Sequence, residues 1–217
     1  MNNVKLSESL KLFKEHGFPV PDFWVIRSSE EVDLLDIPFP VVLKVSSVAY
    51  SHKSDVGGVV VGIPDIDTLK KIYKEKVDKL GETEFVVQTM VSGTIELIAG
   101  TSLDNTFGQV MMFGIGGIFA ELMKDVSYRL IPVNRVDIHD MISELKSSPI
   151  LYGYRDKKPV NIDAITDVMI KLSNFVNKFP DDIAGIDLNP VICNENRSYV
   201  VDVRLILNTD RPLLSPF

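Results

Sequence analysis

Hydrophobic residues recur at helical spacing in several stretches of the chain. Near the N-terminus, Leu6, Leu10 and Phe13 follow this spacing until Gly17, which predicts a helix over 5–17. A second helix is predicted between Asp67, as its N-cap, and Gly81, as its end. Two further helices carry these apolar sets: Ile138, Met141, Ile142 and Leu145; and Ile162, Ile165, Val168, Met169, Leu172, Phe175, Val176 and Phe179.

Short apolar runs between these helices predict strands, and Ser28 with Glu31 forms a capping box that adds a short helix. The mixture of strands and helices favours an α/β protein of the α+β type with two lobes. Ser92-Gly93 is the best internal boundary, so we expect a smaller lobe over 18–91 and a larger lobe over 92–217, with helix 5–17 packed on the larger one. The expected strands are 23–26, 41–45, 58–63, 85–90, 95–99, 109–113, 183–193 and 198–207.

Composition narrows the class of protein. The chain has 217 residues, 45% of them hydrophobic, and a net charge of −7 with scattered Lys and Arg, which excludes a nucleic-acid-binding stripe. The single cysteine, Cys193, excludes an internal disulfide and a cysteine metal cluster. The first residues lack the apolar core of a secretory signal, and the longest apolar run, 110–120, is too short for a membrane helix. We therefore expect a cytoplasmic protein.

The loop between strands 41–45 and 58–63 concentrates candidate phosphate chemistry. Gly57 and Gly58 permit close approach of the backbone to a ligand, and backbone N–H groups in such turns can cradle phosphate oxygens, with Lys53 as a further donor. His52 precedes them, and a neutral imidazole can act as a nucleophile toward phosphorus. Lys44 interrupts the preceding apolar strand and faces either a cleft or solvent. A plain hairpin with an exposed histidine fits the same residues.

The C-terminal hairpin is the second constellation. With a turn at 194–197, Asn189 lies opposite Asp202, and the period of two puts Asp187 on the same face. Two carboxylates and an amide oxygen are ligands that suit Mg²⁺. The alternative is the solvated face of a two-sided hairpin.

Two further segments are less specific. The apolar run 86–91 leads into the lobe boundary, where a purine base can bind in an apolar cleft, although this segment alone favours a plain core strand. The glycine-rich stretch 114–117 precedes Glu121 and Arg129 and lacks the spacing of a dinucleotide fingerprint. It is either an approach for a phosphoryl group or a tight packing turn.

The order of these segments resembles the ATP-grasp fold and, more closely, the nucleotide-binding beta subunit of the nucleoside-diphosphate-forming acyl-CoA synthetases. The resemblance spans nearly the whole chain. It is most specific, for the ADP-forming acetyl-CoA group, in SHKSDVGGV (51–59) and FGIGGIFAELMKDVSYR (113–129). The other matching segments are PVVLKV (40–45), VVQTMVSG (86–93), IDLNPVI (186–192) and VVDVR (200–204).

The resemblance implies an acid–thiol ligase that uses ATP or ADP and Mg²⁺. Its partner would be an alpha subunit, in an alpha2beta2 assembly, carrying a CoA-binding domain and a phosphohistidine. The implied catalytic residues are His52, as phosphoryl relay, with Glu121 and Arg129 lining the approach. The implied nucleotide contacts are Lys44, Lys53, Gly57, Gly58, Gln88, Thr89, Met90, Val91 and Glu96; the implied Mg²⁺ ligands are Asn189, Asp202 and Asp187. Thr89 departs from the Glu that the family usually has there, which puts a ribose or amino contact in doubt.

Two other functions fit the same order of segments. One is an ATP-grasp carboxylate ligase that makes an acyl phosphate directly from ATP. The other is a nucleotide-sensing module without catalysis.

Overall fold

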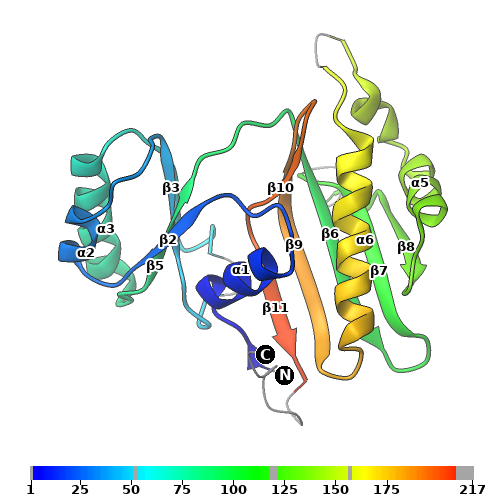
Figure 1. Cartoon of the computed structure of the whole chain (residues 1–217), viewed down its shortest axis with the longest axis horizontal. Coiled ribbons are helices and arrows are strands. Elements are labelled where there is room, and N and C mark those ends of the chain that lie inside the picture. The colour runs from blue at the N-terminus through cyan, green and yellow to red at the C-terminus, as the bar shows by residue number, and fades with distance from the viewer. Residues whose placement is uncertain (1, 51–52, 118–121, 156–157, 209–217) are drawn as a thin grey trace. The chain divides into compact units, whose positions relative to one another are not determined.

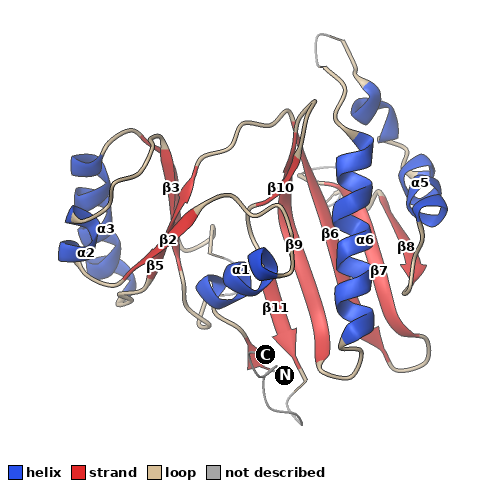
Figure 2. Cartoon of the chain, viewed as in Figure 1, coloured by secondary structure: helices blue, strands red, loops and turns tan. Residues whose placement is uncertain are grey.

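The computed structural model describes residues 2–50, 53–117, 122–155 and 158–208. The chain divides into two compact units (Figure 1). Unit 1 contains Met1–Val4, Leu12–Val20 and Ser92–Phe217, and unit 2 contains Lys5–Lys11 and Pro21–Val91. Both units combine strands with helices (Figure 2), so the expected α+β type with mixed helices and strands is confirmed.

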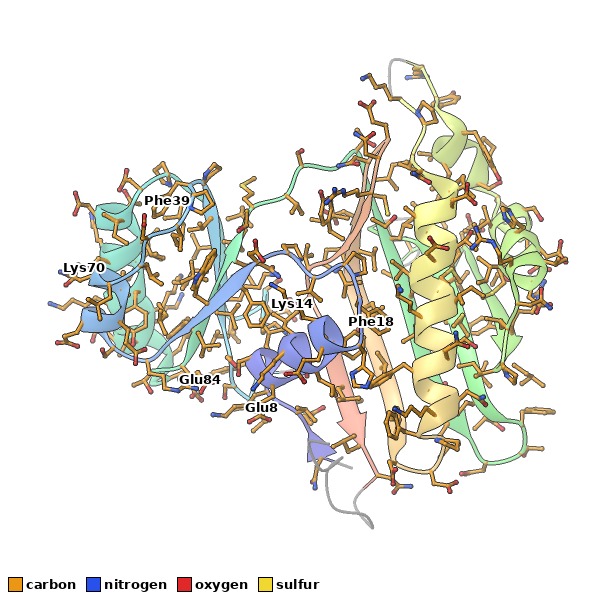
Figure 3. The ribbon with its side chains drawn as sticks, viewed as in Figure 1. Glu8, Lys14, Phe18, Phe39, Lys70 and Glu84 are labelled. Carbon is orange, nitrogen blue, oxygen red and sulfur yellow. The ribbon has the colours of Figure 1, made fainter. Side chains whose placement is uncertain are left out.

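Unit 2 is built on a four-stranded antiparallel sheet in the order β2-β5-β3-β4. Alternate side chains of these strands form a buried core with Val32, Leu69 and Tyr73 from the helices. Lys70 lies on α3 (Figure 3). Its ammonium donates to both carboxylate oxygens of Asp33, at 2.7 Å each, and so links α3 to the end of α2. The elements are β2 (Phe23–Ile26), α2 (Ser29–Asp33), β3 (Val41–Val45), β4 (Val59–Ile63), α3 (Ile66–Leu80) and β5 (Phe85–Thr89).

The helix ends of unit 2 follow the local sequence with two corrections. Ser28 caps α2, but the carboxylate of Glu31 accepts from the N–H of Arg27 rather than from that of Ser28, so the expected capping box is only half formed. The N-cap of α3 is Asp65, which accepts from the Thr68 N–H, and not Asp67, which lies inside the first turn. Gly81 ends α3 with φ 68°, the left-handed conformation that glycine adopts without a Cβ clash.

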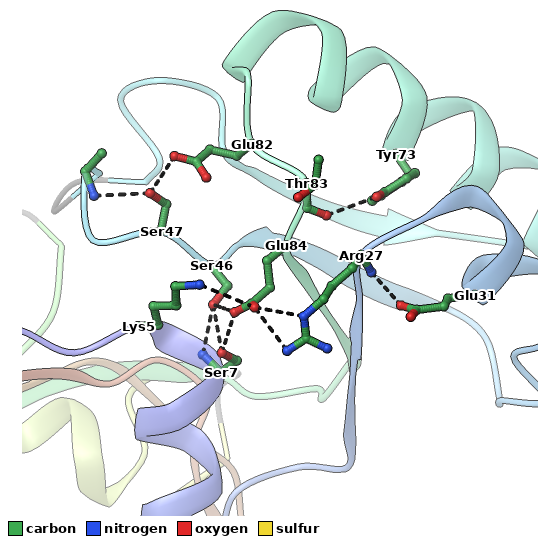
Figure 4. A network of polar contacts seen from close by, with 11 residues as sticks. Lys5, Ser7, Arg27, Glu31, Ser46, Ser47, Tyr73, Glu82, Thr83 and Glu84 are labelled. Atoms are coloured by element: carbon green, nitrogen blue, oxygen red, sulfur yellow. Dashed lines mark hydrogen bonds and ion pairs between the residues drawn. The ribbon is translucent and has the colours of Figure 1, made fainter.

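The carboxylate of Glu84 is buried and binds side chains from several other segments of unit 2 (Figure 4). One carboxylate oxygen accepts from the hydroxyls of Ser7, at 2.7 Å, and Ser46, at 3.0 Å. The other accepts from the Arg27 guanidinium at 3.1 Å and from the Lys5 ammonium at 3.4 Å. Burial alone raises the pKa of Glu84, but these hydrogen bonds and the two cations outweigh it and hold the pKa below 4.5.

Glu84→Gln should therefore lower the free energy of unfolding by about 1–2 kcal/mol at neutral pH, because the buried donors lose a charged acceptor. The pKa of Glu84 is lower in the folded state, so its contribution is present above pH 4.5 and is lost as pH falls through the folded-state pKa. Urea unfolding across this range measures the difference. Glu75→Gln, at a side chain that is 64% exposed, is the matched control. A difference that stays constant down to low pH would contradict the charge-based account.

Unit 1 is built on a seven-stranded sheet in the order β1-β11-β9-β6-β7-β8, with β10 paired to β9. The helices α5 and α6 lie along one face of it (Figure 1). The elements are β1 (Asn2–Asn3), β6 (Ile95–Asp104), β7 (Gly108–Ile115), β8 (Val126–Leu130), α5 (Arg135–Glu144), the 3-10 helix η1 (Ser148–Tyr152), α6 (Ile162–Lys178), β9 (Ile183–Cys193), β10 (Ser198–Val200) and β11 (Arg204–Leu207).

Unit 1 differs from the sequence-based expectation in three places. The strand β8 was not expected, because it is a short edge strand with polar and charged residues between its apolar ones. The expected strand 198–207 is divided into β10 and β11. The N-terminal helix α1 (Leu6–Glu15), expected on the larger lobe, contributes its residues up to Lys11 to unit 2 and its remaining residues to unit 1.

Within the described part of the chain, no helix has both the length and the apolar character needed to cross a membrane.

Candidate functional site

A lysine and a glutamine form a buried polar pair in the sheet of unit 2. Lys44 on β3 is 5% exposed and Gln88 on β5 is 1% exposed. The register pairs Lys44 with Val86 and Val42 with Gln88, so the two polar side chains share one face of adjacent strands. The Lys44 Nζ donates to the Gln88 Oε1 at 2.8 Å. Because lysine has only donors, this bond fixes the amide orientation and leaves the Gln88 Nε2 as a donor.

The donor left by this pair has no acceptor in the described structure. The Gln88 Nε2 and the Thr89 Oγ1 are buried, and neither has a hydrogen-bond partner among the described residues. Buried polar groups are rarely left unpaired, and an orphaned donor is therefore evidence for an absent ligand. An acceptor atom of a nucleotide, such as a purine nitrogen or a phosphate oxygen, fits the Gln88 amide.

Of the three backbone N–H groups from the end of β5 to Val91, one is unused in the described part of the chain. The N–H of Thr89 donates to the Asp22 carbonyl at 2.9 Å, and that of Met90 donates to the Pro40 carbonyl at 3.2 Å. No bond from the Val91 N–H occurs within the described residues. The N–H of Val91, and not those of Thr89 and Met90, is thus the backbone group that can donate to a purine edge.

The N–H groups of Gly57 and Gly58 form hydrogen bonds within their own turn. Gly57 has φ +67°, and its N–H donates to the Ser54 carbonyl at 3.0 Å, while the Gly58 N–H donates to the Lys53 carbonyl at 2.7 Å. A Cβ on Gly58 would lie 2.6 Å from Val45 Cγ1 and 2.9 Å from the Lys53 oxygen, so Gly58 is required for packing of the loop. In this conformation the two N–H groups do not form the phosphate cradle that the sequence suggested. An anion at the turn would need side-chain donors.

The C-terminal hairpin has the register that the sequence predicted on both sides of Asn189 and Asp202. Ser198 pairs with Cys193 and Arg204 with Asp187, which places Asp202 across from Asn189. The ladder is interrupted between these pairs, where Pro190 has no N–H to donate. The alternation is also confirmed. The residues on the core side are Ile186, Leu188, Val201 and Val203, which are 0–6% exposed.

Four candidate residues share one face of the large sheet. Asp187 and Asp202 are partly buried and Asn189 is exposed, and all three alternate with the core residues. Gly100 pairs with Asp187, and Glu96 lies four residues before Gly100 on β6, so the Glu96 side chain has the same direction. Among the described residues no group of three or more His, Cys, Asp and Glu could hold a metal. Any Mg²⁺ here would therefore depend on two carboxylates with the Asn189 amide, a donor set of oxygens that fits this ion.

Arg129 lies on the opposite face of that sheet. It pairs with Met111 on β7, Met111 pairs with Thr101 on β6, and Thr101 pairs with Ile186, so these residues share the face covered by the helices. The Arg129 guanidinium binds both carboxylate oxygens of Glu144 on α5, one of them at 3.0 Å. Hydrogen bonds from Arg129 and from Ser127 lower the pKa of Glu144 to about 2. The structure thus does not bring Arg129 together with Asp187, Asn189 and Asp202.

Two of the predicted catalytic residues, His52 and Glu121, lie outside the described residues. Their roles stay predictions from the sequence.

Comparisons with known proteins identify the family of the chain. A family model described as an ATP-grasp domain matches residues 2–207. The beta subunit of the ADP-forming acetate–CoA ligase I of Pyrococcus furiosus is 38% identical over 212 residues, which covers 92% of this chain and 90% of that one. The chain belongs to this ATP-grasp family.

Longer relatives and solved structures extend this assignment. An ADP-forming acetate–CoA ligase I of Archaeoglobus fulgidus is 37% identical over 94% of this chain, which spans 31% of that protein. The dinucleotide-forming acetyl-coenzyme A synthetase 1 of Ca. Korarchaeum cryptofilum superposes with a TM-score of 0.82 and 36% identity, over 95% of this chain and 93% of that one. That structure holds coenzyme A and Mg-AMPPCP, with its phosphohistidine segment pointing towards the nucleotide-binding site. The predicted ATP-grasp fold and the predicted family are therefore confirmed.

Proposed function

We propose that the chain is the nucleotide-binding subunit of an ADP-forming acyl-CoA synthetase, which couples cleavage of acetyl-CoA to ATP synthesis. The reaction converts acyl-CoA, ADP and phosphate to a carboxylic acid, CoA and ATP. The observation that carries the proposal is the buried Lys44–Gln88 pair with its unused amide donor, which requires a ligand acceptor in an ATP-grasp domain. The names of the relatives supply the reaction.

Each unit carries its own set of proposed contacts, those of 21–91 in unit 2 and those of 92–217 in unit 1. Lys44 and Gln88 bind a phosphate or the base, the Val91 N–H binds the purine edge, and Glu96 faces the ribose. Asp187, Asn189 and Asp202 hold Mg²⁺, which would neutralise phosphate charge during transfer. The Thr89 hydroxyl replaces the carboxylate usual in the family and is a neutral donor with no partner in the described structure, so it suits a ligand oxygen or nitrogen.

The phosphoryl group comes from a partner alpha subunit that carries the CoA-binding domain and a phosphohistidine, in an alpha2beta2 assembly. Transfer breaks the N–P bond of that histidine and forms one to His52, and a terminal oxygen of ADP then attacks the same phosphorus and releases the His52 imidazole. The support is twofold: one relative is a beta subunit, and another is a chain about three times as long as the part matched. The sequence resemblance predicts that Glu121 and Arg129 line the approach of the phosphohistidine. The Glu144 contact of Arg129 favours instead a role in holding β8 to α5.

Reconstitution tests this function. The chain is mixed with an alpha subunit of the ADP-forming acetate–CoA ligases, acetyl-CoA, phosphate, Mg²⁺ and ADP, and ATP is measured with luciferase. We expect ATP only when both chains and the thioester are present, with no ATP from this chain alone. Tight nucleotide binding without ATP formation under any partner condition would contradict the proposal and indicate a nucleotide sensor. An acyl phosphate formed directly from ATP, without a labelled histidine, would indicate a carboxylate ligase.

A further inference from the structure

Two lysines of α3 converge on the glycine turn of unit 2. A Cβ built on Gly57 would lie 3.7 Å from the Lys79 Nζ and 3.8 Å from the Lys76 Nζ. The two lysines are three residues apart on the helix, so their side chains emerge on neighbouring parts of one helix face. Both ammonium groups thus surround a point above the backbone where Gly57 has no side chain.

The loop is held in this place by contacts with the end of α3. The Tyr50 hydroxyl donates to the Leu80 carbonyl at 2.9 Å, and the Ser47 hydroxyl donates to the Glu82 carboxylate at 2.7 Å. Together with the bonds that Gly57 and Gly58 make inside the turn, these contacts fix the backbone beside the two lysines. The approach of the ammonium groups to Gly57 is therefore part of the folded loop.

Few carboxylates of the described residues lie close enough to neutralise Lys76 and Lys79. The Lys76 side chain is only 13% exposed, and its one ion pair among the described residues is a 3.9 Å contact with Glu75, its neighbour in sequence. Lys79 makes no ion pair within the described residues. The helix dipole favours cations near the C-terminus of α3, but it does not direct both of them to one turn. Two like charges brought together in this way repel each other unless an anion lies between them.

We propose that Lys76 and Lys79 form a phosphate-binding site over the Gly57 turn. The ligand is a phosphate group, either the terminal phosphate of the nucleotide or the phosphoryl group that passes through the neighbouring His52. Ammonium groups are well suited to it, because they bind phosphate oxygens as point charges without a fixed geometry. The N–H groups of Gly57 and Gly58 cannot supply these donors, because both are used within the turn. This inference deepens the proposed function and rests on it.

The test uses the full chain and inorganic pyrophosphate as the probe, in low salt by isothermal titration calorimetry. The double substitution Lys76→Met and Lys79→Met should weaken pyrophosphate binding about tenfold or more, because it removes two charged donors. The matched control, Lys71→Met with Lys74→Met, removes the same charge from two exposed positions of the same helix and should change affinity less than twofold. Lys76→Arg with Lys79→Arg keeps both charges and should restore most of the binding.

Two further arms identify the source of the phosphate. If the nucleotide supplies it, the double Met variant weakens binding of Mg–ADP but not of AMP. If the relayed phosphoryl supplies it, ADP affinity is unchanged and the chain retains less acid-labile ³²P from the phosphorylated partner. Equal pyrophosphate affinity, ADP affinity and label in the double variant and the control would overturn the proposal. If wild-type chains fail to make ATP while pyrophosphate binding still depends on the two lysines, the proposed function fails and the anion site stands.

Discussion

His52→Ala should reduce ATP formation by at least about a thousandfold when the chain is assayed with its alpha partner. The reason is chemical: in the proposed relay the imidazole nitrogen accepts the phosphoryl group covalently, and the methyl group of alanine has no lone pair with which to do so. The chain has three histidines, and the resemblance to the acetyl-CoA group assigns the relay to this one. Coupled assay of ATP with luciferase measures the loss.

The matched control is His139→Ala, at an exposed position of α5, which should leave turnover within a factor of two. A second readout separates the relay from a binding role. Wild-type chain incubated with ³²P-phosphorylated partner should carry acid-labile, base-stable label, and the His52→Ala chain should carry none. Full turnover by His52→Ala would contradict the relay and would mean direct transfer from the partner's phosphohistidine to ADP.

Asp202→Ala should reduce turnover about a hundredfold or more at low Mg²⁺ and should raise the Mg²⁺ concentration required for half-maximal rate. Asp202 lies across from Asn189 in a hairpin whose register is set by the pairs on either side, and it shares its face with Asp187. Removing one of two carboxylates leaves too few charged oxygens to hold the ion against water. Initial rates across a Mg²⁺ titration at saturating ADP measure the effect.

The control for Asp202 is Glu195→Gln, at the tip of the same hairpin, where the carboxylate pairs with Lys158 at 2.8 Å on the surface. It should change neither the rate nor the Mg²⁺ requirement, because exposed ion pairs contribute little. Circular dichroism should show both variants folded, since Asp202 lies outside the apolar core. An unchanged Mg²⁺ requirement in Asp202→Ala would place the metal elsewhere.

The sequence predicted most helices and strands that are long or that have clear capping or breaking residues at their ends. The helices α5 and α6 carry apolar stripes, and strands β2, β3 and β9 were predicted to the residue, since each is a run of apolar or alternating residues with clear breakers. The edge strand β8 was not predicted because Arg129 and Ser127 interrupt its apolar residues. Its place in the sheet depends on pairing with β7, which local sequence does not encode.

The register of the C-terminal hairpin was predictable for a specific physical reason. Once the turn at 194–197 is assumed, antiparallel pairing fixes which residues are opposed, and the period of two fixes which share a face. Asp187, Asn189 and Asp202 could therefore be placed together without knowing any distant contact. The register observed on both sides of Pro190 agrees with that count.

Arg129 shows the limit of the same reasoning. Its sequence neighbourhood, shortly after the glycines at 114–117, suggested an approach for a phosphoryl group. Three successive strand pairings place its side chain on the helix-covered face, where Glu144 binds it. Whether two residues on distant strands share one face of a sheet depends on the register of every strand pair between them. The sequence around Arg129 therefore could not decide on which face its side chain lies.

For the loop that begins at His52, the sequence determined the residue types: a histidine, a lysine and two glycines between two strands, in the order typical of this family. Tertiary structure decided what those glycines do. Gly58 is required by contact with Val45, the N–H groups of the turn are used internally, and the cations beside Gly57 come from α3. The physical reason is that a turn's own conformation is local, whereas the charges that surround it are brought by a helix that follows it in the chain and returns only on folding.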